Sequence, residues 1–279
     1  MAADIDFSFL DDPEFGLPSY FKPKQDPMEE FNTLLTQEVP PIREFSGKDS
    51  EEAKKLFKFA KGTTTLAFVF QGGILIAVDA RATMGSFIGS QKVKKVIEIN
   101  DYLLGTMAGG AADCYYWENN LARVCKLYEL KNGERPNVGG AAQILSQMLG
   151  QYRGYGLSVG TMIAGWDHKG PGLYFVDNDG MCLKGNRFSV GSGSIFAYGV
   201  LDSHYRWDMT LDEAVELGRR AIYHAGHRDA MSGGVVRIYH VHAGGWTNII
   251  QAEDLMNIHR QRDAEKGIEF LDDEVTFNS

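Results

Sequence analysis

Two short apolar segments joined by a Gly-Gly dipeptide place the strongest constraint on this chain. Residues 66–70 and 74–78 are almost entirely hydrophobic, and the glycine pair lies between them. This pattern predicts two antiparallel strands joined by a tight hairpin. A hairpin brings the residues before its first strand close to the residues after its second strand. Thr63 and Asp79 are therefore expected to lie side by side.

The dipeptide Gly62-Thr63 comes just before the first apolar segment. A threonine hydroxyl is a weak nucleophile unless a base lies beside it, and a threonine at a chain terminus carries such a base as its own α-amino group. The dipeptide therefore indicates a nucleophile, Thr63, that is uncovered when the chain is cut after Gly62. The alternative is structural, because threonine favours strands and glycine is common at their edges.

A lysine occurs on the apolar side of a third expected strand, residues 92–99. One face of that strand would carry Val93, Lys95, Ile97 and Ile99. A buried lysine is costly unless it is paired, and Asp79 is the partner that the hairpin makes available. An ammonium group beside a hydroxyl and an amine favours the deprotonated form of both, so Lys95 would activate Thr63. Taken alone, Lys95 could also be a salt-bridged strand lysine without a catalytic part.

These motifs belong to a longer set that is similar to one known family. The set comprises GTTTLAF at 62–68, VDARAT at 78–83, VKKVIEIN at 93–100, YLLGTMAGGAADC at 102–114 and RDAMSGG at 228–234. Together these motifs resemble the catalytic β subunits of the proteasome core particle that have chymotrypsin-like specificity. The resemblance extends from Gly62 to about Trp246, and its motifs are too long to arise by chance.

Further catalytic residues are expected around the nucleophile. A tetrahedral intermediate needs a backbone N–H directed at its oxyanion, and the turn at 107–110, which enters a helix N-terminus, offers Gly109 for that purpose. The resemblance implies that three residues orient the hydroxyl and amine of the nucleophile, namely Ser192, Asp229 and Ser232. It also implies that Thr83, Gly109 and Ala111 hold the substrate as an added β-strand.

The implied specificity pocket is roomy and uncharged. Its walls would be formed by Ala82, Val93, Ile97, Met107 and Ala111. Because two of these residues are alanines and the others are apolar, large hydrophobic residues before the scissile bond should fit best. Met84 stands where a smaller residue is expected, which leaves the outline of the adjoining groove open.

The order of the expected elements indicates an α+β fold. Beyond the first strands, helices are expected at 110–131, 138–152, 195–205 and 211–230, and strands at 157–166, 172–177, 181–184, 235–242 and 246–251. Since the helices come in pairs between groups of strands, a doubly wound parallel sheet is disfavoured. A four-layer αββα sandwich of two antiparallel sheets between helical layers fits better. That sandwich is the fold of the N-terminal-nucleophile hydrolases that the chain resembles.

Residues 1–62 differ in composition from the rest of the chain. They hold six of the eight prolines and 13 acidic residues against eight basic ones, which is typical of an extended, weakly ordered arm. We expect this arm to be a prosegment that is removed on maturation, and 63–279 to be a single catalytic domain with a tail from about residue 252. The resemblance implies that the arm assists assembly, whereas its plain alternative is a flexible linker.

Composition argues against several classes of protein. The net charge of −9 disfavours a nucleic-acid partner, and no apolar run approaches the 18 residues of a membrane span. The acidic N-terminus lacks the features of a secretory signal. An odd number of cysteines without a C-x-x-C pair favours free thiols in a reducing compartment. The resemblance implies the cytoplasm and nucleus.

Two patterns could suggest a cofactor or a metal. The glycine-rich stretch at 189–194 does not complete the dinucleotide motif, because Phe196 takes the place of the third glycine, nor does it form the elbow of a serine hydrolase. We expect a turn leading into a helix there. His240 and His242 share one strand face, but no third ligand has suitable spacing. No metal and no cofactor are therefore expected.

The sequence thus predicts the precursor of a threonine endopeptidase subunit of the proteasome core. It would cleave unfolded polypeptides after large hydrophobic residues, activate itself by cleavage between Gly62 and Thr63, and assemble with other α and β subunits in stacked rings. Two alternatives stay open: a non-catalytic structural β subunit, and a small-molecule amidase of the same fold. The joint presence of Thr63, Asp79 and Lys95 after Gly62 counts against the first alternative. A measurement of the native mass tests the second, because a small-molecule amidase would usually not need a barrel of subunits.

Overall fold

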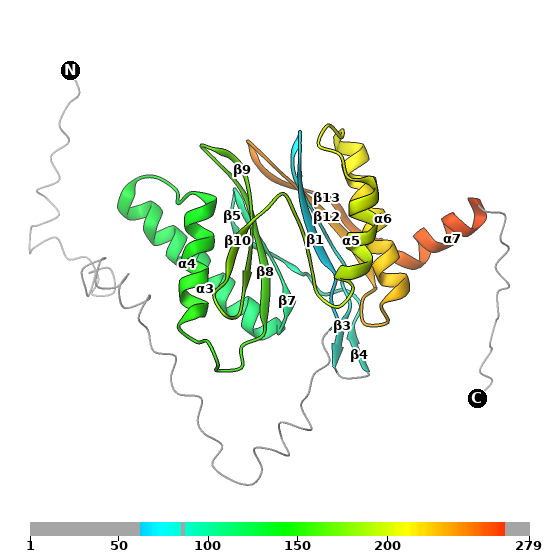
Figure 1. The fold of residues 1–279 in the computed structure, drawn as a ribbon, viewed down its shortest axis with the longest axis horizontal. Helices are drawn as coiled ribbons and strands as arrows, with labels where there is room; N and C mark the ends of the chain where they lie inside the picture. Colours follow the sequence, from blue (N-terminus) through cyan, green and yellow to red (C-terminus); the bar gives the residue numbers. More distant parts are fainter. Residues whose placement is uncertain (1–61, 85–86, 266–279) are drawn as a thin grey trace, which may run out of the picture. The chain divides into compact units, whose positions relative to one another are not determined.

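The computed structural model of this chain describes residues 62–84 and 87–265. Apart from Gly62, the expected prosegment lies outside the described residues. Figure 1 shows the described elements, which are two main sheets with helices on their outer sides. The helices are α3 (Ala111–Asn132), α4 (Val138–Gly150), α5 (Ser194–His204), α6 (Leu211–Arg228) and α7 (Leu255–Glu265).

Both main sheets are antiparallel. The first comprises β1 (Thr65–Phe70), β2 (Gly73–Val78), β11 (Arg187–Val190), β12 (Val235–His242) and β13 (Gly245–Asp254), in the order β11-β1-β2-β12-β13. The second comprises β5 (Val96–Asn100), β6 (Leu103–Thr106), β8 (Val159–Asp167), β9 (Gly170–Asp177) and β10 (Cys182–Lys184), in the order β10-β9-β8-β6-β5. The short strand β7 (Ala108–Gly109) also pairs with β8. A separate hairpin is formed by β3 (Ala82–Met84) and β4 (Phe87–Ser90).

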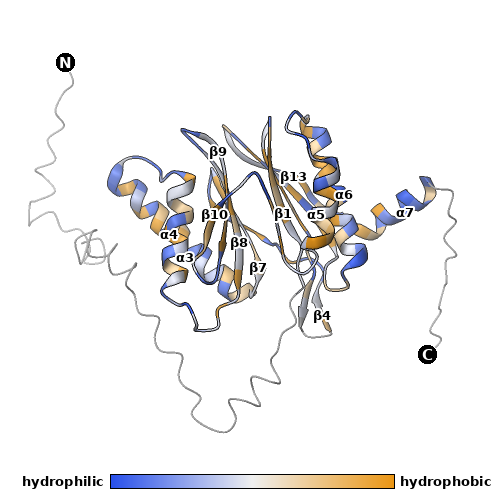
Figure 2. Ribbon diagram, in the orientation of Figure 1, coloured by the Kyte–Doolittle hydropathy of each residue, from blue (hydrophilic) through white to orange (hydrophobic). Residues whose placement is uncertain are grey.

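The layers follow the order helices, sheet, sheet, helices. Helices α3 and α4 contact the second sheet, whereas α5 and α6 contact the first. The four helices α3 to α6 carry both hydrophobic and hydrophilic residues along their length (Figure 2), because one side of each covers a sheet and the other side does not. The predicted αββα sandwich is confirmed.

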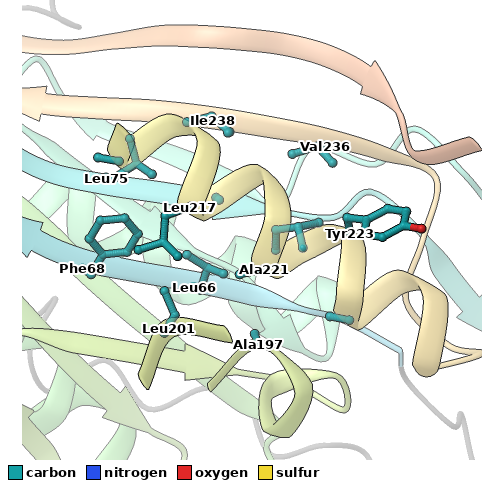
Figure 3. Packing of buried hydrophobic residues seen from close by; sticks show 14 of the residues in the cluster. Leu66, Phe68, Leu75, Ala197, Leu201, Leu217, Ala221, Tyr223, Val236 and Ile238 are labelled. Carbon is teal, nitrogen blue, oxygen red and sulfur yellow. The ribbon is translucent and has the colours of Figure 1, made fainter. Parts of the chain in front are cut away.

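Strand β1, which follows the expected nucleophile, is buried on both faces. Leu66 and Phe68 point toward α5 and α6 and pack with Leu217 in one core (Figure 3). Ala67 and Val69 point the other way, into a second core between the two sheets. Because both faces are covered, the strand is a continuous apolar run without polar alternation.

Local sequence signals set several helix boundaries. Helix α3 ends at Asn132 and is followed by Gly133, whose φ of 69° is favourable for glycine. The side chain of Asn137 accepts a hydrogen bond from the N–H of Gly140 and so begins α4. Thr210 and Glu213 exchange hydrogen bonds at the start of α6, in a capping box.

Three local features differ from the sequence-based expectation. The strand after Lys95 begins at Val96 and not at residue 92, so Lys95 directly precedes β5. Residues 187–190 form β11, which pairs with β1, where a turn was expected over 189–194. The stretch assigned to a tail from about residue 252 includes α7. In the described ranges, no helix has the length and hydrophobicity needed to cross a membrane.

Candidate active site

The hairpin of β1 and β2 brings Thr63 and Asp79 together at one end of the first sheet. Thr65 pairs with Val78 in the strand register, and the N–H of Asp79 donates to the carbonyl oxygen of Thr64 at 3.0 Å. Thr63 therefore lies at the entry to the hairpin and Asp79 at its exit. This proximity is what the Gly-Gly turn requires.

Lys95 joins the two residues. Its Nζ donates to Asp79 Oδ1 at 2.7 Å, to Thr63 Oγ1 at 3.0 Å and to the carbonyl oxygen of Gly62 at 3.2 Å. The side chains of Lys95 and Asp79 are 3% and 0% exposed, so water screens this pair little. Burial lowers the pKa of Lys95, and the neighbouring Asp79 carboxylate opposes that shift.

Three backbone N–H groups hold the Asp79 carboxylate in place. Thr64 donates to Oδ1 at 2.8 Å, while Gly233 and Arg81 donate to Oδ2 at 3.0 and 3.3 Å. The carboxylate thus has partners on both oxygens besides Lys95. Such a fixed anion keeps the lysine head group directed at Thr63.

A second polar group lies on the other side of the nucleophile. Asp229 Oδ2 accepts hydrogen bonds from the hydroxyls of Ser192 and Ser232, each at 2.6 Å. The backbone N–H of Thr63 donates to Ser192 Oγ at 3.3 Å. The hydroxyls of Ser232 and Thr64 lie 2.7 Å apart. The structure thus brings the three predicted support residues to the nitrogen that would become the free amine.

Two glycines of the stretch at 189–194 contact the nucleophile through their backbone. Gly191 has a φ of +105°, and a Cβ there would lie 2.1 Å from the carbonyl oxygen of Thr63. A Cβ on Gly193 would lie 2.0 Å from Thr64 Oγ1 and 3.2 Å from Asp229 Oδ2. Sequence reasoning took this stretch for a simple turn. The signal available was that isolated glycines often mark close backbone approach.

A cavity of about 410 Å³ opens beside Thr63, Lys95 and Gly109. The predicted substrate-binding residues that line it are Ala82, Thr83, Val93, Met107 and Ala111. Ile97 belongs to β5, is buried, and does not line the cavity. The side chain of Met84, which left the groove outline open, lies outside the described part of the structure. Thr83 also touches the expected scissile residue, because its hydroxyl accepts a hydrogen bond from the N–H of Gly62 at 3.0 Å.

The histidine pair on β12 does not form part of a recognisable metal centre. His240 Nε2 lies 2.9 Å from the carbonyl oxygen of Gly72, and the rings of His240 and His242 are 5.2 Å apart. Within the described ranges, no three potential metal ligands come together. The absence of a metal from the reaction stays a prediction.

Comparison with known proteins identifies the family. Residues 59–241 match the Proteasome family, described as "Proteasome subunit". The chain belongs to the proteasome subunit family. It is 56% identical over 239 residues to the "Proteasome subunit beta type-5-A" of Arabidopsis thaliana, with 86% of each chain covered. It is also 58% identical over 224 residues to the beta type-5 subunit of Spinacia oleracea, covering 80% of this chain and 82% of the relative. For the beta type-5 subunit of Dictyostelium discoideum, identity is 51% over 261 residues, covering 94% and 89%.

Similarity to beta type-5 subunits over most of the chain confirms the predicted enzyme class. This proteasome subunit is a threonine-type endopeptidase of the chymotrypsin-like kind. Membership of the family implies assembly with other proteasome subunits in rings. The two alternatives left open by the sequence, a non-catalytic subunit and a small-molecule amidase, are set aside by this assignment.

Proposed function

We propose that Thr63 is the nucleophile of this peptidase and that it first cuts the bond that precedes it. One observation carries the proposal: the buried Lys95 ammonium donates to both Thr63 Oγ1 and the Gly62 carbonyl oxygen. The same cation therefore contacts the attacking oxygen and the carbonyl that it would attack. Thr63 Oγ1 itself lies 2.6 Å from that carbonyl oxygen.

Self-cleavage proceeds by two transfers of the Gly62 acyl group. Thr63 Oγ attacks the Gly62 carbonyl carbon, the C–N bond breaks, and the hydroxyl proton ends on the freed amine of Thr63. An ester then joins Gly62 to Thr63 Oγ. Water adds to the ester, releases the Gly62 carboxylate and restores the hydroxyl. Lys95 stabilises the negative charge that develops on the Gly62 oxygen in both steps.

Substrate cleavage uses the same residues once the amine is free. The α-amine takes the proton from Thr63 Oγ as it attacks a substrate carbonyl, and returns it to the leaving amine of the substrate. Lys95 and Asp79 tune the hydroxyl, while Gly109 N–H stabilises the oxyanion. An unperturbed amine pKa of about 7.7 to 8.0 suits a base near neutral pH. The hydrogen bond between Thr63 N and Ser192 supports a role for Ser192, Asp229 and Ser232 in orienting the amine.

The lining of the cavity supports a preference for large hydrophobic residues before the cut. Small and apolar side chains face the space next to Thr63, namely Ala82, Val93, Met107 and Ala111. Unfolded polypeptides are the proposed substrates, held through the main chain of residues 83, 109 and 111 as an added strand. Cytoplasm and nucleus are the proposed locations, with no nucleic-acid or membrane partner.

N-terminal sequencing of the chain from assembled particles tests the proposal. The mature chain should begin at Thr63, and a Thr63→Ala variant should keep residues 1–62 and lack peptidase activity. Cleavage of the Thr63→Ala variant at the same bond, with all other proteases absent, would overturn self-cleavage. A different mature N-terminus would overturn the choice of nucleophile.

A further inference from the structure

We propose that Asp113 is a positioning residue that holds the oxyanion turn, defined as residues 108–110, in its working geometry. Asp113 belongs to the first turn of α3, directly after the oxyanion turn. The inference rests on the proposed function, because it takes Gly109 as the donor to the oxyanion. Asp113 also lines the cavity beside Thr63, but the role proposed for it acts through the backbone of Ser158.

A pair of hydrogen bonds links the oxyanion turn to the residue before β8. The N–H of Gly110 donates to the carbonyl oxygen of Ser158 at 2.7 Å. The N–H of Ser158 donates in turn to Asp113 Oδ2 at 3.0 Å. Both backbone polar groups of Ser158 are thereby engaged by residues 110 and 113. Asp113 therefore holds the N–H group of Ser158, and the carbonyl group of Ser158 holds the turn.

Gly109 lies directly against the same residue. Its φ is +104°, a conformation that favours glycine, and a Cβ there would lie 2.5 Å from the carbonyl oxygen of Ser158. Gly109 also pairs with Val159 in the register of β7 and β8. Gly109 therefore lies against the carbonyl group of the residue whose N–H is bound by Asp113. If Ser158 moves, Gly109 loses its support.

Besides the contact with Ser158, the turn is held by the pairing of β7 with β8 and by contacts with α3. Helix α3 begins after Gly110, which has no side chain to cap the helix. Cys114 contributes two contacts, since its N–H donates to Gly110 at 2.9 Å and its Sγ to the carbonyl oxygen of Ala108 at 3.4 Å. Both contacts belong to α3 and would move with it. The pairing of β7 with β8 ties residues 108 and 109 to the second sheet, and the link through Ser158 adds Gly110, which lies outside that pairing.

The alternative explanation is purely electrostatic. An acidic residue in the first turn of a helix interacts favourably with the helix dipole wherever its oxygens point. Two substitutions separate the explanations. Asp113→Asn keeps a side-chain oxygen at the same distance from the backbone but removes the charge, whereas Asp113→Glu keeps the charge and moves the oxygens by one methylene.

The test compares two inhibitors of identical peptide sequence on assembled particles. One carries a C-terminal aldehyde, to which Thr63 Oγ adds to give a hemiacetal whose oxygen occupies the oxyanion position. The other ends in an amide and binds without a covalent bond. To remove any dependence on self-cleavage, the chain is produced with Thr63 freed from a cleavable leader, and residues 1–62 are supplied as a separate chain.

We expect Asp113→Glu and Asp113→Ala to weaken aldehyde binding by about 10-fold to 100-fold, since small displacements of a catalytic group have effects of this size. Amide binding should stay within about 2-fold of wild type, and Asp113→Asn should keep most of the aldehyde affinity. If Asp113→Ala does not assemble, the Asn and Glu variants still decide the question.

Three outcomes would overturn the inference. Equal loss for both inhibitors means that Asp113 shapes the cavity in general. Loss in Asp113→Asn together with full affinity in Asp113→Glu means that the helix dipole explains the effect. Unchanged binding in all variants means that the oxyanion turn keeps its conformation without Asp113. Failure of the wild-type particle to bind the aldehyde at Thr63 would instead refute the proposed nucleophile, which keeps the two failures distinguishable.

Discussion

A Cβ atom on Gly62 would lie 2.0 Å from the carbonyl oxygen of Met231. Gly62 therefore lies against the backbone that follows α6, with no room for a side chain. The N–H of Gly62 donates to Thr83 Oγ1, and its carbonyl oxygen accepts from Lys95. The scissile residue is held at its N–H, its carbonyl and its Cα.

Gly62→Ala should block maturation while the chain still folds. The added methyl must push the scissile carbonyl away from Lys95, and a displacement of about 1 Å can slow a reaction about 100-fold. Mass spectrometry of assembled particles should find the precursor uncut. As a control, the same substitution in a chain whose Thr63 is freed by another protease should leave peptide hydrolysis normal. If the Gly62→Ala variant matures like wild type, the backbone at Met231 can move to make room for the added methyl group.

Lys95→Ala should leave a folded subunit that keeps its prosegment and hydrolyses peptides at least about 100-fold more slowly, because it loses the cation beside Thr63. Lys95→Arg should recover little, since a planar guanidinium does not replace a compact ammonium in a small buried site. The matched control is Lys94→Ala. Lys94 forms an exposed ion pair with Glu98, and such pairs contribute little. Similar turnover for the two alanine variants would reduce Lys95 to a structural residue.

Ala111→Val should narrow the specificity pocket. Cleavage after leucine, tyrosine or phenylalanine should fall by about 10-fold, because each excluded methylene changes discrimination by roughly 1 to 3 kcal/mol. Cleavage after small residues should change less, and removal of the prosegment should continue, since Gly62 has no side chain. A fluorogenic peptide panel on assembled particles measures this. An unchanged preference would place the pocket away from Ala111.

Glu118 should make the stability of the chain depend on pH. Glu118 belongs to α3 and its side chain is fully buried. Its Oε1 accepts a hydrogen bond from Thr161 at 2.8 Å, and Oε2 has no hydrogen-bond partner in the described structure. Burial raises its pKa from 4.5 to about 8. The folded chain thus keeps a proton that the unfolded chain loses above pH 4.5, so this contribution to stability is full below pH 4.5 and declines up to about pH 8.

Urea unfolding of the isolated precursor checks this sign. Between pH 5.5 and 8, wild type should lose about 3 kcal/mol relative to Glu118→Gln, from 2.5 pH units at about 1.36 kcal/mol each. Glutamine has nearly the same shape and does not titrate, so it removes this one contribution. Parallel pH profiles for the two proteins would mean that Glu118 is already ionised in the folded chain.

The sequence was sufficient to predict the part of the site whose residues are close together along the chain. Thr63 and Asp79 are joined by a single hairpin, and a short turn between apolar strands leaves few arrangements for its ends. Lys95 was found because a lysine among apolar residues needs a partner. Its role did not depend on the exact start of β5, which the alternation pattern placed four residues too early.

The parts that the sequence did not predict depend on contacts between distant segments. Thr64 meets Ser232 across 168 positions, and Gly193 is constrained by the Thr64 hydroxyl. Strand β11 is short and partly polar, so only its pairing with β1 makes it a strand. In the sequence, the tripeptide at 191–193 looks like an ordinary turn. Only the structure shows that its glycines lie against the backbone of Thr63 and the hydroxyl of Thr64. Of the support residues, Ser192, Asp229 and Ser232 came from the family resemblance and not from spacing.

The burial of β1 on both faces has a consequence for how a new subunit becomes active. A strand packed between two cores has little freedom to shift when the Gly62–Thr63 bond is cut. On the proposed mechanism, the groups around Thr63 therefore already stand where the mature enzyme needs them. If Thr63 is the nucleophile as proposed, the precursor is inhibited because the Gly62 carbonyl occupies the catalytic centre, and not because that centre is distorted. Activation then requires only the cleavage of one peptide bond, and its rate is set by that reaction and not by refolding.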